Sequence, residues 1–249
     1  MEENRIQRIE GYVQSRMGKP LVPDLMVAHD FKHVDRVRGW ALRIARGEGY
    51  GALEVVEAAA LLHDVGLPYV EQRSQHAAVG AEIAARFLLE ENLFGGAEIE
   101  EIAEAIRLHS SLADGSELLY ILRDADMLDL FGAVGIMRAL TSKYMKPEYD
   151  PDHVKGDSWG MDASDFTQRF VEGIGIGRYI VDQINFQISC FDNLRTETAK
   201  QIARPLIDFM KTYMVQLDFE VNQLRGYRET PHKASDHESR GLLGTQAWR

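Results

Sequence analysis

Apolar positions recur along the chain at the three- and four-residue spacing of amphipathic helices, and no segment alternates strictly as a half-buried strand does. This spacing predicts an all-α protein. N-terminal helices are expected over about residues 3–17, 30–46, 54–64 and 98–109, with two more that begin near 74 and 116. Further on, we expect one long helix over about 166–193 and a last helix that begins near Pro205, because proline is favoured in a first helical turn.

Histidines extend the apolar stripes of four different predicted helices; they are His33, His63, His76 and His109. Any one of them could be a hydrogen-bonded core histidine. However, His63 is followed directly by Asp64, and an imidazole beside a carboxylate is costly to bury unless it is hydrogen-bonded or bound to a metal. The sixth helix adds the segment Asp124-Ala125-Asp126-Met127-Leu128-Asp129. Polar side chains that converge from several helices are typical of metal sites in bundles.

The segment over about residues 141–165 is polar and contains prolines and glycines. A loop of this length is either a functional lid or a plain connector. The glycines at 173, 175 and 177 follow no strand and precede no Lys-Ser/Thr, so they indicate close helix packing or a kink, not a phosphate-binding loop. The last helix presents an apolar stripe, which is either core or a homodimer face; its members are Phe209, Met210, Tyr213, Leu217, Val221 and Leu224.

Composition narrows the function. The formal charge of −11 argues against a nucleic-acid surface or a membrane partner. The single cysteine, Cys190, excludes an internal disulfide and any multi-thiolate site. Because the N-terminus does not resemble a secretory signal and no stretch reaches the roughly 20 apolar residues of a membrane span, a cytoplasmic protein is expected.

Three regions are expected: a helical core over residues 1–140, a lid-like loop with C-terminal helices packed on the same core over 141–228, and a disordered tail over 229–249. The tail is polar. His232 and His237 fall in it and are given no role.

The order His33, His63-Asp64, Asp126 resembles the HD-domain superfamily of metal-dependent phosphohydrolases, which are helical bundles named for the His-Asp pair. The resemblance covers about residues 25–140. A less diagnostic likeness to small bacterial HD hydrolases of nucleoside triphosphates continues through Thr196–Lys200 into the last helix. The segments that carry the main resemblance are His29–Val37, Leu61–Gly66, Ala105–Ser110 and Asp124–Asp129.

The resemblance implies a first metal held by His33, His63, Asp64 and Asp126, with Asp124 as the alternative last ligand. Imidazole and carboxylate donors suit divalent Mn, Fe, Ni, Co or Mg. Some dinuclear members add two histidines in the interval that His76 and His109 occupy. These two would either hold a second metal or act on the substrate phosphate. Candidates for substrate contact are His29, Arg36, Lys143 and Lys146.

The implied activity is hydrolysis of a phosphoester or phosphoanhydride, most simply in a nucleotide, by a nucleoside triphosphate pyrophosphohydrolase or a nucleotidase. Two alternatives stay open at this point. The same side chains could serve a di-iron oxygenase of the superfamily. The domain could also be a non-catalytic module that senses nucleotides or acts as a scaffold, although such modules typically lose ligands.

Overall fold

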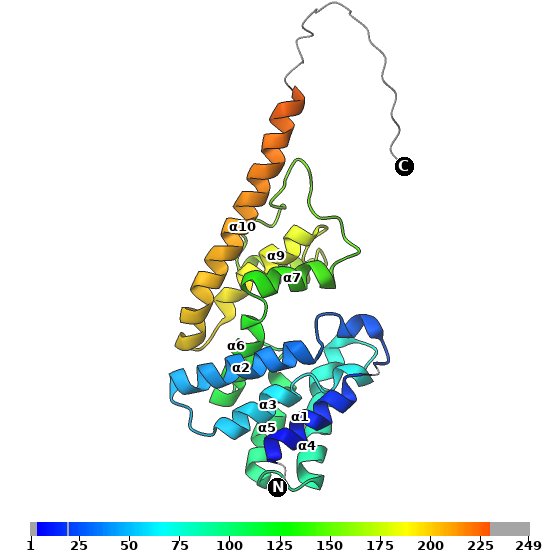
Figure 1. The fold of residues 1–249 in the computed structure, drawn as a ribbon, viewed down its shortest axis with the longest axis vertical. Coiled ribbons are helices and arrows are strands. Elements are labelled where there is room, and N and C mark those ends of the chain that lie inside the picture. The colour runs from blue at the N-terminus through cyan, green and yellow to red at the C-terminus, as the bar shows by residue number, and fades with distance from the viewer. Residues whose placement is uncertain (1–3, 19, 230–249) are drawn as a thin grey trace, which may run out of the picture.

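The computed structural model describes residues 4–18 and 20–229, and this part of the chain is helical and contains no strand. The all-α prediction is confirmed. The first six helices form the lower body in Figure 1. Their bounds are α1 Arg5–Arg16, α2 Phe31–Glu48, α3 Leu53–Leu62, α4 His76–Glu90, α5 Gly96–Leu108 and α6 Glu117–Leu128, with short 3₁₀ helices η1 Pro23–Met26, η2 Leu67–Tyr69 and η3 Arg73–Gln75.

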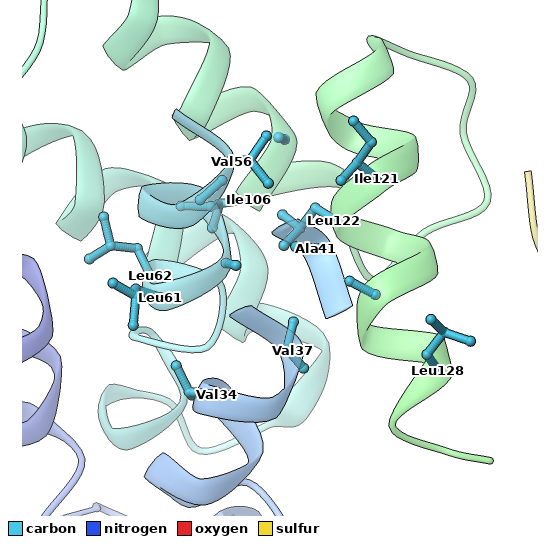
Figure 2. Close-up of a cluster of buried hydrophobic side chains, with 14 of the residues drawn as sticks. Val34, Val37, Ala41, Val56, Leu61, Leu62, Ile106, Ile121, Leu122 and Leu128 are labelled. Carbon is cyan, nitrogen blue, oxygen red and sulfur yellow. The ribbon is translucent and has the colours of Figure 1, made fainter. Parts of the chain in front are cut away.

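The core of this body lies between α2, α3, α5 and α6, where aliphatic side chains from the four helices meet (Figure 2). Helix α3 is buried on nearly every side, which explains its almost continuous apolar sequence. Val37, Leu62, Ile106 and Leu122 are at most 1% exposed. Burial of each such side chain contributes about 1.5–3 kcal/mol to stability.

Four further helices follow: α7 Gly132–Ser142, α8 Ala163–Val171, α9 Ile180–Ser189 and α10 Glu197–Glu229, with η4 Cys190–Asn193 between the last two. Helix α10 packs on α2, α6, α7 and α9, and its C-terminal end projects beyond the other described helices (Figure 1). None of the helices in the described ranges combines the length and apolar character that a bilayer crossing requires.

The prediction of a single helix over residues 166–193 is wrong, because α8 ends at Val171 and α9 begins at Ile180. The glycines between them do not pack inside a helix. Gly173, Gly175 and Gly177 have φ values of +74°, +71° and +136°, which residues with a side chain rarely adopt. They lie in the connection between two separate helices.

The last helix begins at Glu197 and not near Pro205, which lies inside it. Thr196 caps this earlier start, since its hydroxyl accepts a hydrogen bond from the amide of Ala199 at 3.3 Å. Burial of the stripe that includes Ala199, Ala203 and Ile207 then outweighs the hydrogen bond that proline removes. Helix α7 was not expected from the sequence at all.

Gly66 lies where the loop after α3 touches the first turn of α4. A Cβ at this position would overlap the carbonyl oxygen of His76 and lie 2.5 Å from the amide nitrogen of Gly80. Both are backbone atoms, so neither can move aside as a side chain would. The absence of a side chain at Gly66 therefore lets the end of α3 and the start of α4 approach each other.

We expect Gly66→Ala to lower the free energy of unfolding by about 1–3 kcal/mol or more, because the added methyl group overpacks this contact. Gly39 is the matched control, since it is exposed within α2 and a Cβ there meets nothing within 4 Å. Gly39→Ala should stabilise by about 0.5–1 kcal/mol. Urea unfolding of both variants checks this pair, and equal effects in the two would contradict the close approach at Gly66.

The tail expected over 229–249 lies outside the described residues, apart from Glu229 at the end of α10, and so do His232 and His237. Three members of the predicted apolar stripe of the last helix do pack on the core: Met210, Tyr213 and Leu217. Phe209, in the same predicted stripe, is 49% exposed.

Candidate metal centre

The four histidines of the predicted stripes are placed at helix ends that meet in one buried region. His33 lies in the first turn of α2, where Asp30 caps the helix by accepting the amide of His33. His63 directly follows α3, His76 is the first residue of α4, and His109 directly follows α5. All four are at most 4% exposed. Each helix thus continues its apolar face to a terminal imidazole.

The carboxylate of Asp64 lies at the centre of these imidazoles, and each of its oxygens faces two of them. Its Oδ2 is 3.5 Å from Nε2 of His33 and 3.4 Å from Nε2 of His63. Its Oδ1 is 3.4 Å from Nε2 of His76 and 3.8 Å from Nε2 of His109. Asp64 is therefore positioned to link two groups of ligands.

Asp126 completes the first of these groups. Its Oδ1 is 3.4 Å from Nε2 of His33, and one ligand atom each from His33, His63 and Asp126 lies within 4.8 Å of the others. A second such group joins Asp64, His76 and His109. We call the six residues of these two groups the His-Asp cluster: His33, His63, Asp64, His76, His109 and Asp126.

Backbone carbonyls fix the orientation of three imidazoles in the cluster. Nδ1 of His63 donates to the carbonyl of Ala60 at 2.7 Å, and Nδ1 of His109 donates to that of Ile106 at 2.7 Å. Nδ1 of His76 donates likewise to the carbonyl of Arg73 at 2.5 Å. Because a carbonyl only accepts, the proton of each neutral ring is held on Nδ1 and the lone pair is on Nε2.

The Nε2 atoms then face one another in two pairs. Those of His33 and His63 are 3.3 Å apart, and those of His76 and His109 are 3.2 Å apart. Lone pairs held this close repel unless a cation or a proton lies between them. Imidazole nitrogens together with carboxylate oxygens suit a divalent ion, and the outward Nδ1 bonds are the arrangement that metal-binding histidines use. The residues therefore fit a bound metal.

The Nδ1 atom of His33 is held by a side chain, Asp129, at 2.7 Å. Arg36 in turn donates to this carboxylate through Nε at 2.7 Å and Nη2 at 2.9 Å, and the guanidinium of Arg138 also contacts it. Arg36, expected to contact substrate, therefore forms an ion pair with Asp129 that supports His33. Sequence reasoning missed the roles of Asp129 and Arg138.

The electrostatics of the cluster favour positive charge. Burial alone lowers the pKa of His33, but hydrogen bonds to Asp126, Asp129 and Asp64 outweigh it and raise that pKa to about 10. Burial raises the pKa of Asp64, yet the surrounding histidines hold it well below its ordinary value. In contrast, burial lowers the pKa of His109 to about 4. A cation at the carboxylates would take the place of the proton on His33.

Asp124, the alternative last ligand, lies in a different environment from Asp126. Its carboxylate accepts the backbone amides of Arg195 and Thr196 and the hydroxyl of Thr196, at 2.6–3.1 Å. These bonds anchor the start of α10. Asp124 is fully buried and belongs to neither group of the His-Asp cluster. Of the two aspartates, Asp126 therefore lies in the cluster and Asp124 does not.

The other expected substrate contacts are His29, Lys143 and Lys146. His29 is buried and its Nδ1 donates to Oδ2 of Asp64 at 2.9 Å, so it supports the carboxylate directly. Lys146 donates to the carbonyl of Gly177. Burial lowers the pKa of Lys143, and the nearby charges of Lys146 and Arg73 lower it further. These three cations therefore gather in one region, and Arg73 is the member that sequence reasoning missed.

A pocket of about 440 Å³ lies beside the cluster, and we call it the α6–α8 pocket. His109 and Asp126 line it where it meets the cluster. Arg73 and Arg123 also line it, while its apolar wall includes the rings of Phe166, Phe170 and Phe186. The pocket thus combines an apolar wall with positive charge.

Cys190 lines the same pocket but is only 6% exposed, and burial raises the pKa of its thiol to about 12. The thiolate is the reactive form, so at pH 8 only about one molecule in 10⁴ is reactive. We expect native protein to react very slowly with a disulfide reagent such as DTNB at pH 8, and guanidinium-unfolded protein to release one equivalent at once. Fast labelling of the native protein would contradict this burial.

Comparison with known proteins adds a family match. A family model described as the HD domain matches residues 30–131. This segment runs from the cap of α2 to just after α6, so it contains every member of the His-Asp cluster. A search of curated proteins found no match.

Solved structures are similar over most of the chain. An HD-superfamily hydrolase from Bacillus thuringiensis has a TM-score of 0.60 and 24% identity over 88% of this chain and 97% of its own. A predicted HD superfamily hydrolase from an uncultured Thermotogales bacterium has a TM-score of 0.55 and 25% identity, over 90% and 94%. Bacillus subtilis YpgQ in complex with ADP has a TM-score of 0.55 and 22% identity, over 86% and 97%. The shared fold therefore extends beyond residue 131.

Proposed function

The chain belongs to the HD-domain superfamily, and on this premise we propose that it is a metal-dependent phosphohydrolase that acts on a nucleotide. The observation that carries the proposal is that two pairs of imidazoles face each other beside the carboxylate of Asp64. The Nε2 atoms are 3.3 Å apart in the pair His33 and His63, and 3.2 Å apart in the pair His76 and His109. Such an arrangement is stable when positive charge lies between the rings. The geometry supports a distinct role for each residue of the cluster.

In this proposal His33, His63, Asp64 and Asp126 hold the first divalent ion. His76, His109 and Asp64 would hold a second ion, since one carboxylate oxygen of Asp64 faces the two histidines. A divalent ion bound by these residues would lower the pKa of a water molecule and neutralise charge on phosphoryl oxygens. Mn, Fe, Co, Ni and Mg all suit these donors.

The geometry favours a binding role for His76 and His109 over protonation of the leaving oxygen. Nδ1 of each ring is committed to a carbonyl, so the atom that faces the cluster carries the lone pair. Asp129 orients His33 through its Nδ1 atom, and His29 donates a hydrogen bond to the carboxylate of Asp64. In the overall reaction, water attacks phosphorus, the P–O bond to the leaving group breaks, and the leaving oxygen takes up a proton.

A nucleotide fits the surroundings of the cluster. The α6–α8 pocket offers aromatic side chains on which a base could pack, and Arg73 and Lys143 add positive charge nearby. A structural neighbour, YpgQ, has been solved with ADP. We further propose that the enzyme is a nucleoside triphosphate pyrophosphohydrolase or a nucleotidase, and that it is cytoplasmic. We also propose that the loop before α8 acts as a lid and that the C-terminal helices form a homodimer.

A metal-supplemented substrate screen tests the proposal. Protein stripped with EDTA would be loaded with each divalent ion and offered nucleoside mono- and triphosphates, cyclic nucleotides and dinucleoside polyphosphates. We expect release of phosphate or pyrophosphate from at least one class, lost in EDTA and restored by metal. No hydrolysis with any ion, together with oxygen consumption by the iron-loaded protein, would replace the hydrolase with an oxygenase.

A further inference from the structure

A buried cation lines the α6–α8 pocket without a counter-ion. Arg123 on α6 is 1% exposed. Its Nη2 donates to the carbonyls of Leu108 at 3.3 Å and Ala113 at 2.8 Å, but its Nε and Nη1 are buried without a hydrogen-bond partner. Within the described ranges it forms no salt bridge with a carboxylate. A buried charge that lacks compensation is costly, which favours an anion as its partner.

The position of Arg123 relates it to the His-Asp cluster. It lies three residues before Asp126 on the same helix, or about 4.5 Å along the helix axis at 1.5 Å per residue. Both side chains line the same pocket, as does His109. An anion bound by Arg123 would therefore be a near neighbour of a phosphoryl group bound at the cluster.

The charges around Arg123 do not already supply that anion. Arg195 lies close enough to lower the pKa of Arg123 beyond the effect of burial, and it is itself paired with Asp114 at 2.7 Å. Asp124 is also near, but its oxygens are occupied by the amides and the hydroxyl at the start of α10. The unpaired nitrogens of Arg123 are thus left for something that enters the pocket.

We propose that Arg123 binds a second phosphoryl group of the substrate, adjacent to the one at the His-Asp cluster, so that the enzyme prefers phosphoanhydrides to phosphate monoesters. This inference rests on the phosphohydrolase proposed above. A phosphoryl group offers negative charge and several acceptor oxygens, which match the donors of a guanidinium. A monoester has no second phosphoryl group and would leave Arg123 unpaired. Arg73, on the wall of the same pocket, adds a second cation for the same anionic chain.

The test compares two ligands in one protein. Manganese-loaded wild-type enzyme and variants would be titrated calorimetrically with imidodiphosphate, which resists hydrolysis, and with inorganic phosphate. We expect wild type to bind imidodiphosphate more tightly, Arg123→Met to weaken that binding at least tenfold, and phosphate binding to change less than twofold. Arg107→Met is the matched control, because Arg107 is half exposed, pairs with Glu104 and lies outside this pocket.

Arg123→Lys keeps the positive charge and replaces the methionine variant if that variant does not fold. It should also lower the ratio of imidodiphosphate affinity to phosphate affinity. The ratio within one protein is insensitive to the folded fraction. Equal losses for both ligands, or no loss in a folded variant, would overturn the role of Arg123. Hydrolysis of monoesters alone would also overturn it while leaving the phosphohydrolase intact, whereas failure to hydrolyse any phosphate compound counts against the function itself.

Discussion

Replacing Asp64 by asparagine is expected to lower kcat/KM for metal-dependent phosphate release by about 10³-fold or more, or ~4 kcal/mol of transition-state stabilisation. Asparagine keeps the shape of the side chain but loses its negative charge and one of its two acceptor oxygens. Each oxygen of Asp64 faces a different pair of histidines, so the substitution weakens both groups of ligands at once. Steady-state kinetics at saturating metal measures the loss.

His63→Ala should have an effect of the same size, because it removes one of the two facing Nε2 atoms. Glu104→Ala is the control, since the side chain of Glu104 is 54% exposed, pairs with Arg107 on α5, and lies outside both the His-Asp cluster and the α6–α8 pocket. That variant should keep the activity of the wild type. Normal turnover in both Asp64→Asn and His63→Ala would remove the His-Asp cluster from the reaction.

Asp129→Asn is expected to lower the free energy of unfolding by about 3–5 kcal/mol and to weaken metal binding about 10–100-fold. Asp129 is 1% exposed and is the shared partner of His33, Arg36 and Arg138. Without its charge, two guanidinium groups lose their counter-ion in or near the core. His33 also loses the carboxylate that orients it toward the cluster.

Chemical denaturation of the metal-free protein and calorimetric titration with Mn²⁺ measure the two effects of Asp129→Asn separately. Asp157→Asn is the matched control, because the side chain of Asp157 is 80% exposed. A stability change of the same small size in both variants would show that Asp129 does not hold this network together.

The sequence predicted the N-terminal helices well because their apolar stripes are regular and their ends are marked. Four imidazoles continue those stripes, and all four are buried in the structure. Helical periodicity predicts the burial of these histidines, since a residue that continues an apolar stripe lies on the buried side of the helix. Proline and glycine misled the prediction further on, where burial of α10 overrode Pro205 and positive φ values at Gly173, Gly175 and Gly177 separated α8 from α9.

Asp124 and Asp126 in α6, with Asp129 directly after it, show why spacing alone could not identify the metal ligands. At about 100° per residue, Asp126 and Asp129 lie about 60° apart around the helix, and Asp124 lies about 160° from Asp126. Periodicity therefore separates their faces but does not say what each face meets. That depends on α2 for Asp129 and on the start of α10 for Asp124, both distant in sequence.

The α6–α8 pocket was beyond sequence reasoning for the same reason. Its walls come from α6, α8 and α9 and from segments before α4, after α5 and before α10, which are far apart in the sequence. Arg73 and Arg123 read as ordinary charged residues in the sequence. Only the packing shows that the first lies near Lys143 and that the second is buried with unpaired nitrogens.

The central claim is that His33, His63, Asp64 and Asp126 hold a divalent cation. Anomalous diffraction from crystals of the Mn²⁺-loaded protein, recorded on both sides of the manganese absorption edge, tests it most directly. We expect an anomalous peak about 2.0–2.3 Å from His33 Nε2, His63 Nε2 and the carboxylates of Asp64 and Asp126. Manganese bound at a different place, with no peak among these four side chains, would contradict it.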